Sequence, residues 1–250
     1  DIAVLKAKTS DVAAINSDFH AVKPASGYCV GETAIAIGNP EGEGISVTKG
    51  IVSVDNENIA LQIDGTGRYY RSLRIDTSLY SGNSGGGLFN EKGELIGITN
   101  AGNQEDQNIN YAIPVEIAVG VADNIIYYDR DGNDATSGAY KITLGVTVQA
   151  KNMKYVYNEA AGRGDIREDV TVVSVAESSI AETIGIQADD TLIAFCIDGT
   201  EYELLRNFNV SDLLLKVRAG AEINFRFVRD GETRFGTPYT VPSSALVQMP

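Results

Sequence analysis

The sequence LRIDTSLYSGNSGGGLFNEKGELIGITN spans residues 73–100 and contains a glycine-rich turn, Gly-Asn-Ser-Gly-Gly, at residues 82–86. Attack on a carbonyl by a serine hydroxyl needs an exposed side chain on a tight turn and two backbone N–H groups that converge on the oxyanion. Glycines on both sides of Ser84 permit the unusual dihedral angles of such a turn. The pattern favours Ser84 as a nucleophile, with an oxyanion hole in the turn Gly82, Asn83 and Ser84. The N–H groups of Gly82 and Ser84 are the expected donors.

Short strand candidates surround this turn. Gly is abundant, with 26 residues, and Pro is scarce, with 6, which suits many short strands joined by tight turns. A turn-rich segment, residues 9–28, separates the first candidate strand from the rest. We expect a mainly β domain built as an antiparallel barrel or sandwich. Its candidate strands are residues 1–8, 32–38, 45–54, 59–63, 71–76, 86–89, 94–100 and 109–113.

The length and charge of the chain limit its organisation and its partners. A chain of 250 residues suits two domains, since domains cluster near ~100–150 residues. The net charge is −14, from 34 acidic and 20 basic residues. Nucleic acid is disfavoured as a partner because no basic stripe would displace counterions from phosphates. No stretch approaches the ~18 consecutive apolar residues of a membrane-spanning helix.

A domain boundary is expected after a helical segment. Pro114 opens an apolar run with helical period that continues through Tyr128, and proline is well tolerated in a first helical turn. The residues that follow are polar and turn-forming. We expect a first domain at 1–128, a linker at 129–138, a second domain at 139–241 and a tail at 242–250.

The second domain combines short strands with two helical pieces. The helices are expected at 178–184 and 210–218, and the second of them is followed by a glycine stop at Gly220. Residues 151–169 form a polar insertion. The candidate strands are residues 140–148, 170–175, 190–197, 201–204, 221–228 and 234–241.

Further segments extend the pattern around Ser84 along the chain. They read AIGNPEG at 36–42, VTKGIVSV at 47–54 and NYAIP at 110–114. Together with residues 73–100, they follow the order found in trypsin-like serine proteases of the HtrA (Deg) type, which residues 1–127 resemble. Gly87 departs from the family pattern, which usually has Pro there. The resemblance implies the trypsin-like antiparallel fold with a complete second barrel and a first barrel that is largely absent.

The resemblance also implies the catalytic partners of Ser84. The family's triad aspartate begins a strand written Asp-Ile/Leu-Ala-Val-Leu-Lys, which Asp1 and the next five residues match; the alternative is that Asp1 only caps a strand. The family order His, Asp, Ser puts the catalytic histidine before Asp1. The only histidine, His20, is expected at the surface of a loop. The chain is thus expected to lack the N-terminal part with the catalytic His, and losses near ~10⁶-fold follow deletion of a triad histidine.

The walls of the specificity pocket follow from the same resemblance. They are the segment Thr77, Ser78 and Leu79 and the facing strand Ile98, Thr99 and Asn100. No acidic residue stands at the expected base of the pocket, so we expect a preference for small or aliphatic side chains. Thr99 and Asn100 could equally be plain strand residues.

The second domain resembles PDZ domains, which have an α+β fold. The resemblance covers KITLGVTV at 141–148, the segment 172–199, the helix at 210–218 and the hairpin that begins at Ile223. It implies that Leu144, Gly145 and Val146 offer N–H groups to a terminal carboxylate, while the peptide pairs along the strand beside the helix. The polar insertion at 151–169 is longer than the family usually has, which leaves the edge of the groove open.

The function implied is that of a serine endopeptidase that cleaves unfolded or misfolded polypeptides captured through the PDZ domain, with this chain inactive by itself. The alternative is a catalytically inactive, protease-derived scaffold that binds peptides. Expected partners are polypeptide substrates and C-terminal peptides, and neither a cofactor nor a metal is expected. The resemblance implies a bacterial-type extracytoplasmic location, which is periplasmic, at the cell surface or membrane-anchored. It also implies a homotrimer in the full-length protein, and places any membrane anchor in the absent N-terminal part.

Overall fold

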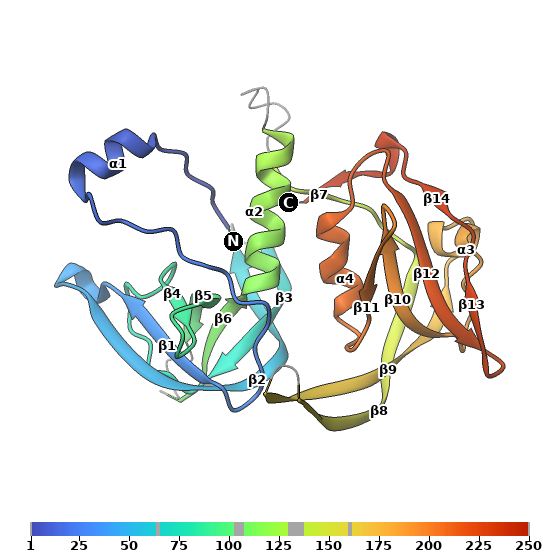
Figure 1. The fold of residues 1–250 in the computed structure, drawn as a ribbon, viewed down its shortest axis with the longest axis horizontal. Helices are drawn as coiled ribbons and strands as arrows, with labels where there is room; N and C mark the ends of the chain where they lie inside the picture. Colours follow the sequence, from blue (N-terminus) through green and yellow to red (C-terminus); the bar gives the residue numbers. More distant parts are fainter. Residues whose placement is uncertain (1, 64–65, 103–107, 130–137, 160–161, 250) are drawn as a thin grey trace. The chain divides into compact units, whose positions relative to one another are not determined.

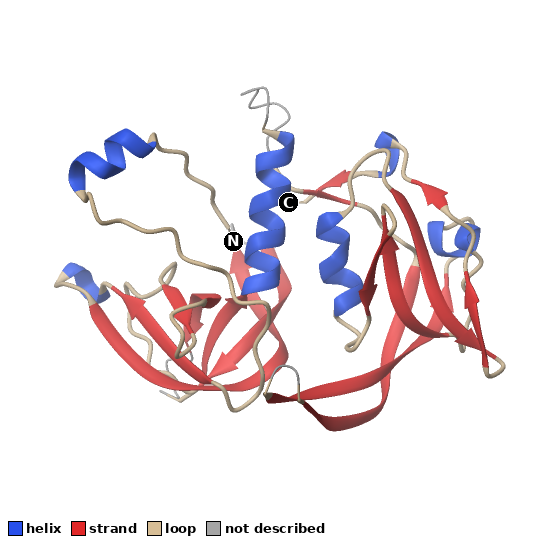
Figure 2. Cartoon of the chain, in the orientation of Figure 1, coloured by secondary structure: helices blue, strands red, loops and turns tan. Residues whose placement is uncertain are grey.

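The computed structural model describes residues 2–63, 66–102, 108–129, 138–159 and 162–249 (Figure 1). They fall into two compact units, one within residues 1–119 and one within residues 120–250. Strands predominate in both units (Figure 2), which confirms the mainly β fold class. The division falls inside helix α2, Val115–Tyr128. The limits predicted for the two domains, the linker and the tail stay predictions, and residues 130–137 of the predicted linker lie outside the described residues.

Six strands of the first unit close into an antiparallel barrel. Their order around the barrel is β1-β2-β3-β6-β5-β4, and β4 pairs with β1 to close it. Buried and partly exposed side chains alternate along β1 and β6, because successive side chains of a strand point to opposite faces. The strands are β1 (Thr33–Gly38), β2 (Ser46–Ile63), β3 (Thr66–Ile75), β4 (Gly87–Phe89), β5 (Leu95–Gly102) and β6 (Asn110–Pro114).

The barrel matches the strands predicted between residues 32 and 113, with one difference. The segments 45–54 and 59–63 were predicted as two strands, and the structure joins them in the long strand β2. Register shifts between β2 and β3 at Val54 and Glu57 interrupt the regular pairing there. A short 3-10 helix, η1 (Pro40–Gly42), connects β1 to β2. The core combines alanines with larger aliphatic side chains, namely Ala34, Ala36, Val52, Leu73, Ile75, Leu88, Ile96 and Ala112.

The prediction of a strand at residues 1–8 is wrong for the residues that the structure describes. Residues 2–8 have no regular secondary structure, and they are followed by helix α1 (Thr9–Ile15), where turns were predicted. A strand needs a neighbouring strand to satisfy its backbone N–H and C=O groups. None of the described strands pairs with residues 2–8. Helix α1 buries none of its side chains.

Helix α2 confirms the helical segment predicted from Pro114 to Tyr128. In the first unit its opening turn is held by Glu116, which accepts hydrogen bonds from Arg71 Nη2 at 2.5 Å and from the Tyr28 hydroxyl at 2.6 Å. Burial raises the pKa of Tyr28 well above its ordinary value, and the charge of Glu116 adds to the rise. Tyr28 therefore stays protonated and donates to Glu116 over the physiological pH range.

The second unit is built on an antiparallel sheet with the order β13-β12-β10-β9-β8. Strand β11 pairs with β10, and β14 pairs with β12. A separate two-stranded sheet joins β15 to β7. The strands are β7 (Tyr140–Lys141), β8 (Val146–Asn158), β9 (Arg163–Val175), β10 (Thr191–Ile197), β11 (Thr200–Glu203), β12 (Glu222–Arg229), β13 (Glu232–Phe235), β14 (Tyr239–Thr240) and β15 (Val247–Gln248).

Two helical segments were predicted in this unit, and the structure has both. The first is α3 (Ile180–Ile184), where the Ser179 hydroxyl caps the first turn by accepting from Glu182 N at 3.2 Å, and Gly185 ends the helix with a φ of +94°. The second consists of α4 (Asn209–Leu213) and the 3-10 turn η2 (Leu214–Lys216). A third short turn is η3 (Ser243–Ala245).

The polar insertion at 151–169 extends the sheet. Strands β8 and β9 pair from Val146↔Val175 to Asn158↔Arg163, so the strands predicted at 140–148 and 170–175 continue into a long hairpin. On β8 the residues from 151 to 155 are exposed, which suits the polar character of the segment. The exposed aromatic side chains Tyr155 and Tyr157 lie on β8.

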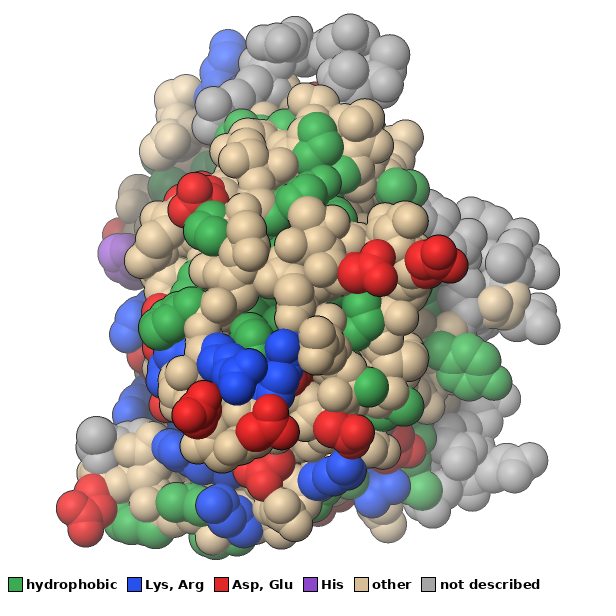
Figure 3. Space-filling model, turned by 90° about the vertical axis from the view of Figure 1, so that its right-hand side faces the viewer, with side chains coloured by type: hydrophobic (Ala, Val, Ile, Leu, Met, Phe, Trp, Pro, Cys, Tyr) green, Lys and Arg blue, Asp and Glu red, His purple; other side chains and the backbone are tan. Residues whose placement is uncertain are grey.

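On the face shown in Figure 3, Lys and Arg side chains lie among Asp and Glu side chains, and hydrophobic side chains are scattered between them. Among the described helices, none combines the length and apolar character that a bilayer crossing requires. No three His, Cys, Asp or Glu side chains in the described part of the chain come together to hold a metal ion.

Candidate functional sites

Ser84 lies in the turn formed by residues 82–86, here called the serine turn, between β3 and β4. Gly82 and Gly85 have φ angles of +97° and +86°, a region that glycine adopts freely and other residues rarely adopt. The two glycines explain how the chain can reverse so tightly on both sides of Ser84. The Ser84 side chain is exposed, and its hydroxyl donates to Asn100 O at 2.9 Å.

Strand β5 holds the serine turn through Thr99. Gly85 N–H donates to Thr99 O at 2.8 Å, and Thr99 N–H donates to Gly86 O at 2.9 Å. The Thr99 side chain is buried, and its hydroxyl lies 2.5 Å from Asn83 O and 3.1 Å from Gly86 O. One residue therefore binds the turn on both sides of Ser84, which fixes the backbone that presents the nucleophile.

Two further glycines let the serine turn lie directly against β1. A Cβ atom at Gly86 would be 2.4 Å from Ile37 O, and one at Gly38 would be 2.3 Å from Asn83 Oδ1. Real Cβ atoms essentially never approach other atoms so closely. The landmark AIGNPEG at 36–42 thus has a physical reason: its glycine makes room for the side chain of the residue before Ser84.

The three residues predicted for the oxyanion hole differ in the state of their N–H groups. Asn83 N–H donates to Tyr80 O at 3.0 Å, which closes a turn and occupies that donor. The N–H groups of Gly82 and Ser84 have no hydrogen-bond partner among the described residues. These two donors are the pair that the sequence singled out.

Six residues were predicted to line a substrate pocket. Two of them, Thr77 and Thr99, are buried, and their hydroxyl groups bond to backbone carbonyls. The Thr77 hydroxyl donates to Ala34 O at 3.2 Å, and Thr77 O accepts from Asn110 Nδ2 at 3.0 Å. Thr99 is turned into the serine turn. Both side chains hold backbone rather than present a surface to a ligand. The other four are half-buried: Ser78, Leu79, Ile98 and Asn100.

The proton acceptor for Ser84 is not found among the described residues. The predicted triad aspartate, Asp1, lies outside the described residues. His20 is exposed, as expected, and lies in the segment between α1 and the isolated bridge at Pro24. The Ser84 hydroxyl is directed to the carbonyl of Asn100, which cannot act as a base at neutral pH.

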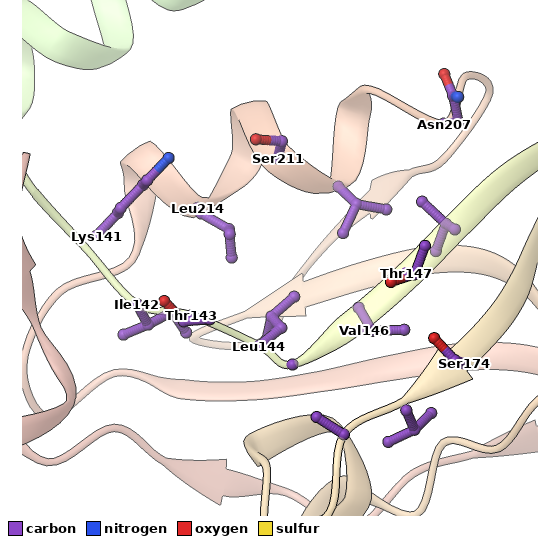
Figure 4. A pocket seen from close by; sticks show the side chains of 15 residues that line it. Lys141, Ile142, Thr143, Leu144, Val146, Thr147, Ser174, Asn207, Ser211 and Leu214 are labelled. Atoms are coloured by element: carbon purple, nitrogen blue, oxygen red, sulfur yellow. The ribbon is translucent and has the colours of Figure 1, made fainter. Parts of the chain in front are cut away.

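A second candidate site is a groove in the other unit, with a volume of about 470 Å³. It lies between the start of β8 and helix α4, and residues 142–145 close one end (Figure 4). Leu144, Val146, Val210 and Leu214 give it an apolar lining. An open groove beside an edge strand suits an extended peptide that adds to the sheet.

The loop before β8 is fastened through its carbonyl groups. Ala176 N–H donates to Gly145 O at 2.8 Å, and Ala181 N–H donates to Leu144 O at 2.9 Å. Gly145 has a φ of +74°, and a Cβ there would be 2.4 Å from Ser179 Cβ. The carbonyl oxygens of Leu144 and Gly145 therefore accept hydrogen bonds from Ala181 in α3 and from Ala176 before it. The positive φ and the close contact with Ser179 mean that only glycine fits at position 145.

The register of β8 decides which backbone groups face the groove. The bond from Ala176 N–H to Gly145 O makes these two residues a hydrogen-bonded pair of the antiparallel ladder. Such pairs alternate with pairs whose N–H and C=O groups point away from the partner strand. The next pair is Val146↔Val175, so the backbone groups of Val146 point to the open edge. Of Leu144, Gly145 and Val146, the register turns the backbone groups of Val146 toward the groove, and binding of a carboxylate by these residues stays a prediction.

Sequence patterns missed several residues of this groove. Lys141, Asn207, Ser211 and Leu214 also line it, and none of them was predicted to bind peptide. Lys141 is the first residue of the segment 141–148 that resembles PDZ domains, and the other three lie on or near a helix that was predicted. The helical period could have assigned Leu214 to the groove face, whereas Asn207 is placed there by the loop before α4.

Comparison with known proteins assigns the class of the chain. Residues 1–98 match the family model for the trypsin-like peptidase domain. The probable periplasmic serine endoprotease DegP-like of Hahella chejuensis is 28% identical over 239 residues, which cover 93% of this chain and 45% of the relative. The serine endoprotease DegS of Haemophilus influenzae is 30% identical over 198 residues, which cover 77% of this chain and 50% of that protein.

A solved structure agrees with these relatives. The HtrA-type protease AlgW with tripeptide matches with a TM-score of 0.54 and 27% identity, over 92% of this chain and 70% of that one. The chain thus carries a trypsin-like peptidase domain. It belongs to the HtrA-type proteases, as the sequence landmarks indicated. It spans about half the length of the curated relatives it matches.

Proposed function

We propose that this chain is part of an HtrA-type serine endopeptidase in which Ser84 is the nucleophile. The observation that carries the proposal is the serine turn, which exposes Ser84 between two glycines of positive φ and leaves two N–H groups beside it without partners among the described residues. An exposed hydroxyl next to preorganised donors is the arrangement that acyl transfer requires. The names of the relatives, which are serine endoproteases, support the same assignment.

The chemistry assigns a role to each group. The Ser84 oxygen attacks the peptide carbonyl, its proton passes to a histidine, and the N–H groups of Gly82 and Ser84 bind the oxyanion. The histidine then protonates the leaving amine, and water releases the acyl group. By the family resemblance, the histidine comes from sequence that precedes residue 1, and Asp1 orients it. Without that histidine, we expect the chain to hydrolyse peptides barely at all.

In this proposal the groove of the second unit is the peptide-binding site of a PDZ domain, and it binds the substrate. A C-terminal carboxylate would bind at residues 144–146, while the peptide pairs with the open edge of β8 and places its last side chain between Leu144 and Leu214. Lys141, at the same end of the groove, adds a positive charge that favours a carboxylate. A solved HtrA-type protease that resembles this chain has a bound tripeptide.

The substrate class follows from this mode of capture. Strand addition selects free C-termini and extended segments, which unfolded or misfolded polypeptides expose and folded proteins conceal. We propose a bacterial-type extracytoplasmic location, in line with relatives that are named periplasmic. The full-length protein is proposed to assemble as a trimer, with any membrane anchor in sequence before residue 1.

Peptide capture is tested by removing only the terminal charge. A fluorescent hexapeptide with a free apolar C-terminus is expected to bind, and its C-terminal amide is expected to bind at least ~10-fold more weakly, since hydrogen bonds to a charged group contribute roughly 1.5–3 kcal/mol. Fluorescence anisotropy measures both affinities. Equal binding of the two peptides would remove the carboxylate site from the proposal.

The role of Thr99 is tested with two variants of the full-length protein. Thr99→Val removes the hydroxyl bonded to the serine turn at nearly constant volume. Labelling of Ser84 by a fluorophosphonate is expected to slow by ~10–100-fold, because small displacements of a nucleophile lower reactivity steeply. Thr99→Ser keeps the hydroxyl and should label at close to the wild-type rate. If Thr99→Val labels as fast as wild type, Thr99 does not position the nucleophile.

The alternative, an inactive scaffold derived from a protease, is favoured by one observation, the lack of a base for Ser84 among the described residues. It predicts peptide binding without fluorophosphonate labelling of the full-length protein. The endopeptidase predicts both, so the labelling experiment separates the two.

A further inference from the structure

We propose that Asn124 is a positioning residue of the peptide groove: its side-chain amide joins the two segments that form the groove walls and sets their spacing. The inference rests on the proposed peptide-binding function and adds to it a residue that lies outside the groove. Asn124 is on α2, whereas the groove is lined by the segment 141–148 and by α4 with its flanking residues.

The Asn124 amide is fully buried and bonded on both sides. Nδ2 donates to Tyr140 O at 2.8 Å and to Leu215 O at 2.9 Å, and Oδ1 accepts from Tyr140 N–H at 2.7 Å. Both amide hydrogens and one acceptor position are therefore used. A buried amide is costly unless it is hydrogen-bonded, so these contacts specify the arrangement of the three residues.

Its two partners stand next to the groove. Tyr140 is followed directly by Lys141 and Ile142, which line one wall, and Leu215 follows Leu214, which lines the other. In Figure 4, Lys141 and Leu214 lie at the same end of the groove, away from Asn207. The amide thus joins the two walls at the end where the peptide carboxylate is proposed to bind.

The Asn124 side chain acts as a strand neighbour for β7. It bonds both the N–H and the C=O of Tyr140, as a peptide unit of an adjacent strand would. On the other side, β7 pairs with β15 through Val247↔Lys141 and Gln248↔Tyr140. Strand β7, which leads into the loop 142–145, is therefore held from both sides, by β15 and by Asn124. Asn124 also binds Leu215 in η2, the turn that follows α4.

Helix α2 can approach Leu215 closely because the residue one turn before Asn124 is a glycine, Gly120. Gly120 and Asn124 are four residues apart and share a face of the helix. A Cβ atom at Gly120 would be 3.1 Å from both Cβ and Cδ1 of Leu215. Close packing at Gly120 brings the helix near enough for a short side chain to reach Leu215 O and Tyr140 together.

The test compares two variants that each change a buried side chain of the same unit. Asn124→Leu keeps the side-chain size and removes all three hydrogen bonds, so the free hexapeptide is expected to bind at least ~10-fold more weakly. Phe227→Leu is the control: Phe227 is buried in the core of the same unit and is absent from the groove lining. Thermal unfolding establishes that both variants fold and compares their Tm values, and anisotropy gives the affinities. Weak binding by Asn124→Leu alone supports the proposal, whereas equal affinities in the two variants overturn it.

A second measurement separates this proposal from the proposed function. Hydrogen exchange of the amides at 141–146 is expected to be at least ~10-fold faster in Asn124→Leu than in Phe227→Leu, because local opening follows the loss of the contacts that hold a segment. If wild type binds neither the free nor the amidated peptide, the peptide-binding function fails, and the exchange rates alone decide on Asn124. Unchanged exchange at 141–146 means that Asn124 does not hold the groove.

Discussion

In the full-length protein, Ser84→Ala is expected to slow hydrolysis of an unfolded polypeptide by ~10⁶-fold, the scale of loss when a triad nucleophile is removed. Fluorophosphonate labelling should disappear with it. The physical reason is that no other hydroxyl shares the position of Ser84, between Gly82 and Gly85 and next to two N–H donors without partners among the described residues. The measurements are the rate of cleavage of an unfolded protein and the labelled fraction resolved by mass spectrometry.

The matched control is Ser81→Ala. Ser81 is exposed in the same loop, three residues before the nucleophile, and its hydroxyl is in no hydrogen bond among the described residues. Its replacement should leave cleavage and labelling within about twofold of wild type, since surface substitutions of this kind change stability by no more than ~0.5 kcal/mol. Labelling that persists in Ser84→Ala at the wild-type level would falsify the assignment of the nucleophile.

Gly145→Ala should abolish peptide capture while the rest of the unit stays folded. The new Cβ would lie 2.4 Å from Ser179 Cβ, and position 145 has a φ of +74°. Ser179 caps α3 and cannot retreat without moving that helix, so the loop 142–145 must shift instead. We expect the affinity for the free hexapeptide to fall by at least ~100-fold, which corresponds to ~2.7 kcal/mol.

Gly199→Ala separates the effect of the clash from that of the backbone. Gly199 has almost the same φ, +76°, but a Cβ there meets nothing within 4 Å. Both substitutions carry the cost of a left-handed alanine, ~1–2 kcal/mol, and both should lower the Tm. Only Gly145→Ala should lose the peptide. A similar loss in both variants would attribute the effect to general destabilisation and remove the special role of position 145.

The barrel was predictable because its signals are local. Short runs such as residues 32–38 and 109–113 combine β-branched and small residues with flanking turns, and each became a strand of the barrel. The helix that begins after Pro114 was equally predictable, since a proline start and an apolar helical period point to the same element. In these elements the local sequence preference and the tertiary structure agree, so the sequence alone predicted them.

Elements that depend on distant partners were not predictable. Residues 2–8 have the composition of a strand, but no described strand pairs with them. Residues 151–169 have the composition of a polar loop, but cross-strand pairing turns them into a hairpin. In both cases the outcome is decided by whether a neighbouring strand exists, which the local sequence does not encode.

The candidate sites also contain residues that local sequence indicates and residues whose roles depend on distant partners. The glycines around Ser84 indicated the serine turn from sequence alone, whereas residues 144–146 were proposed only from the resemblance to PDZ domains. The roles of Thr99 and Asn124 could not be found from sequence, because a threonine in a strand and an asparagine in a helix are ordinary residues until their partners are known. Thr99 meets the serine turn across 13–16 positions, and Asn124 meets Leu215 across 91.

Strand β8 is the outer edge of its sheet, and an open edge invites pairing with any extended chain. The register between β8 and β9 shifts twice: between Thr147 and Val148, where the extra residue is on β9, and between Lys151 and Lys154, where it is on β8. An extra residue bends and twists the strand that carries it, so only the second shift interrupts β8 itself. Regular pairing along β8 can therefore run from Val146 to about Lys151, roughly 20 Å at ~3.3 Å per residue. If β8 binds peptide as proposed, this limit sets the length of peptide that one molecule can bind. The exposed side chains of Lys151 and Lys154 and the irregular register at this point are features that disfavour pairing between the edge strands of neighbouring molecules.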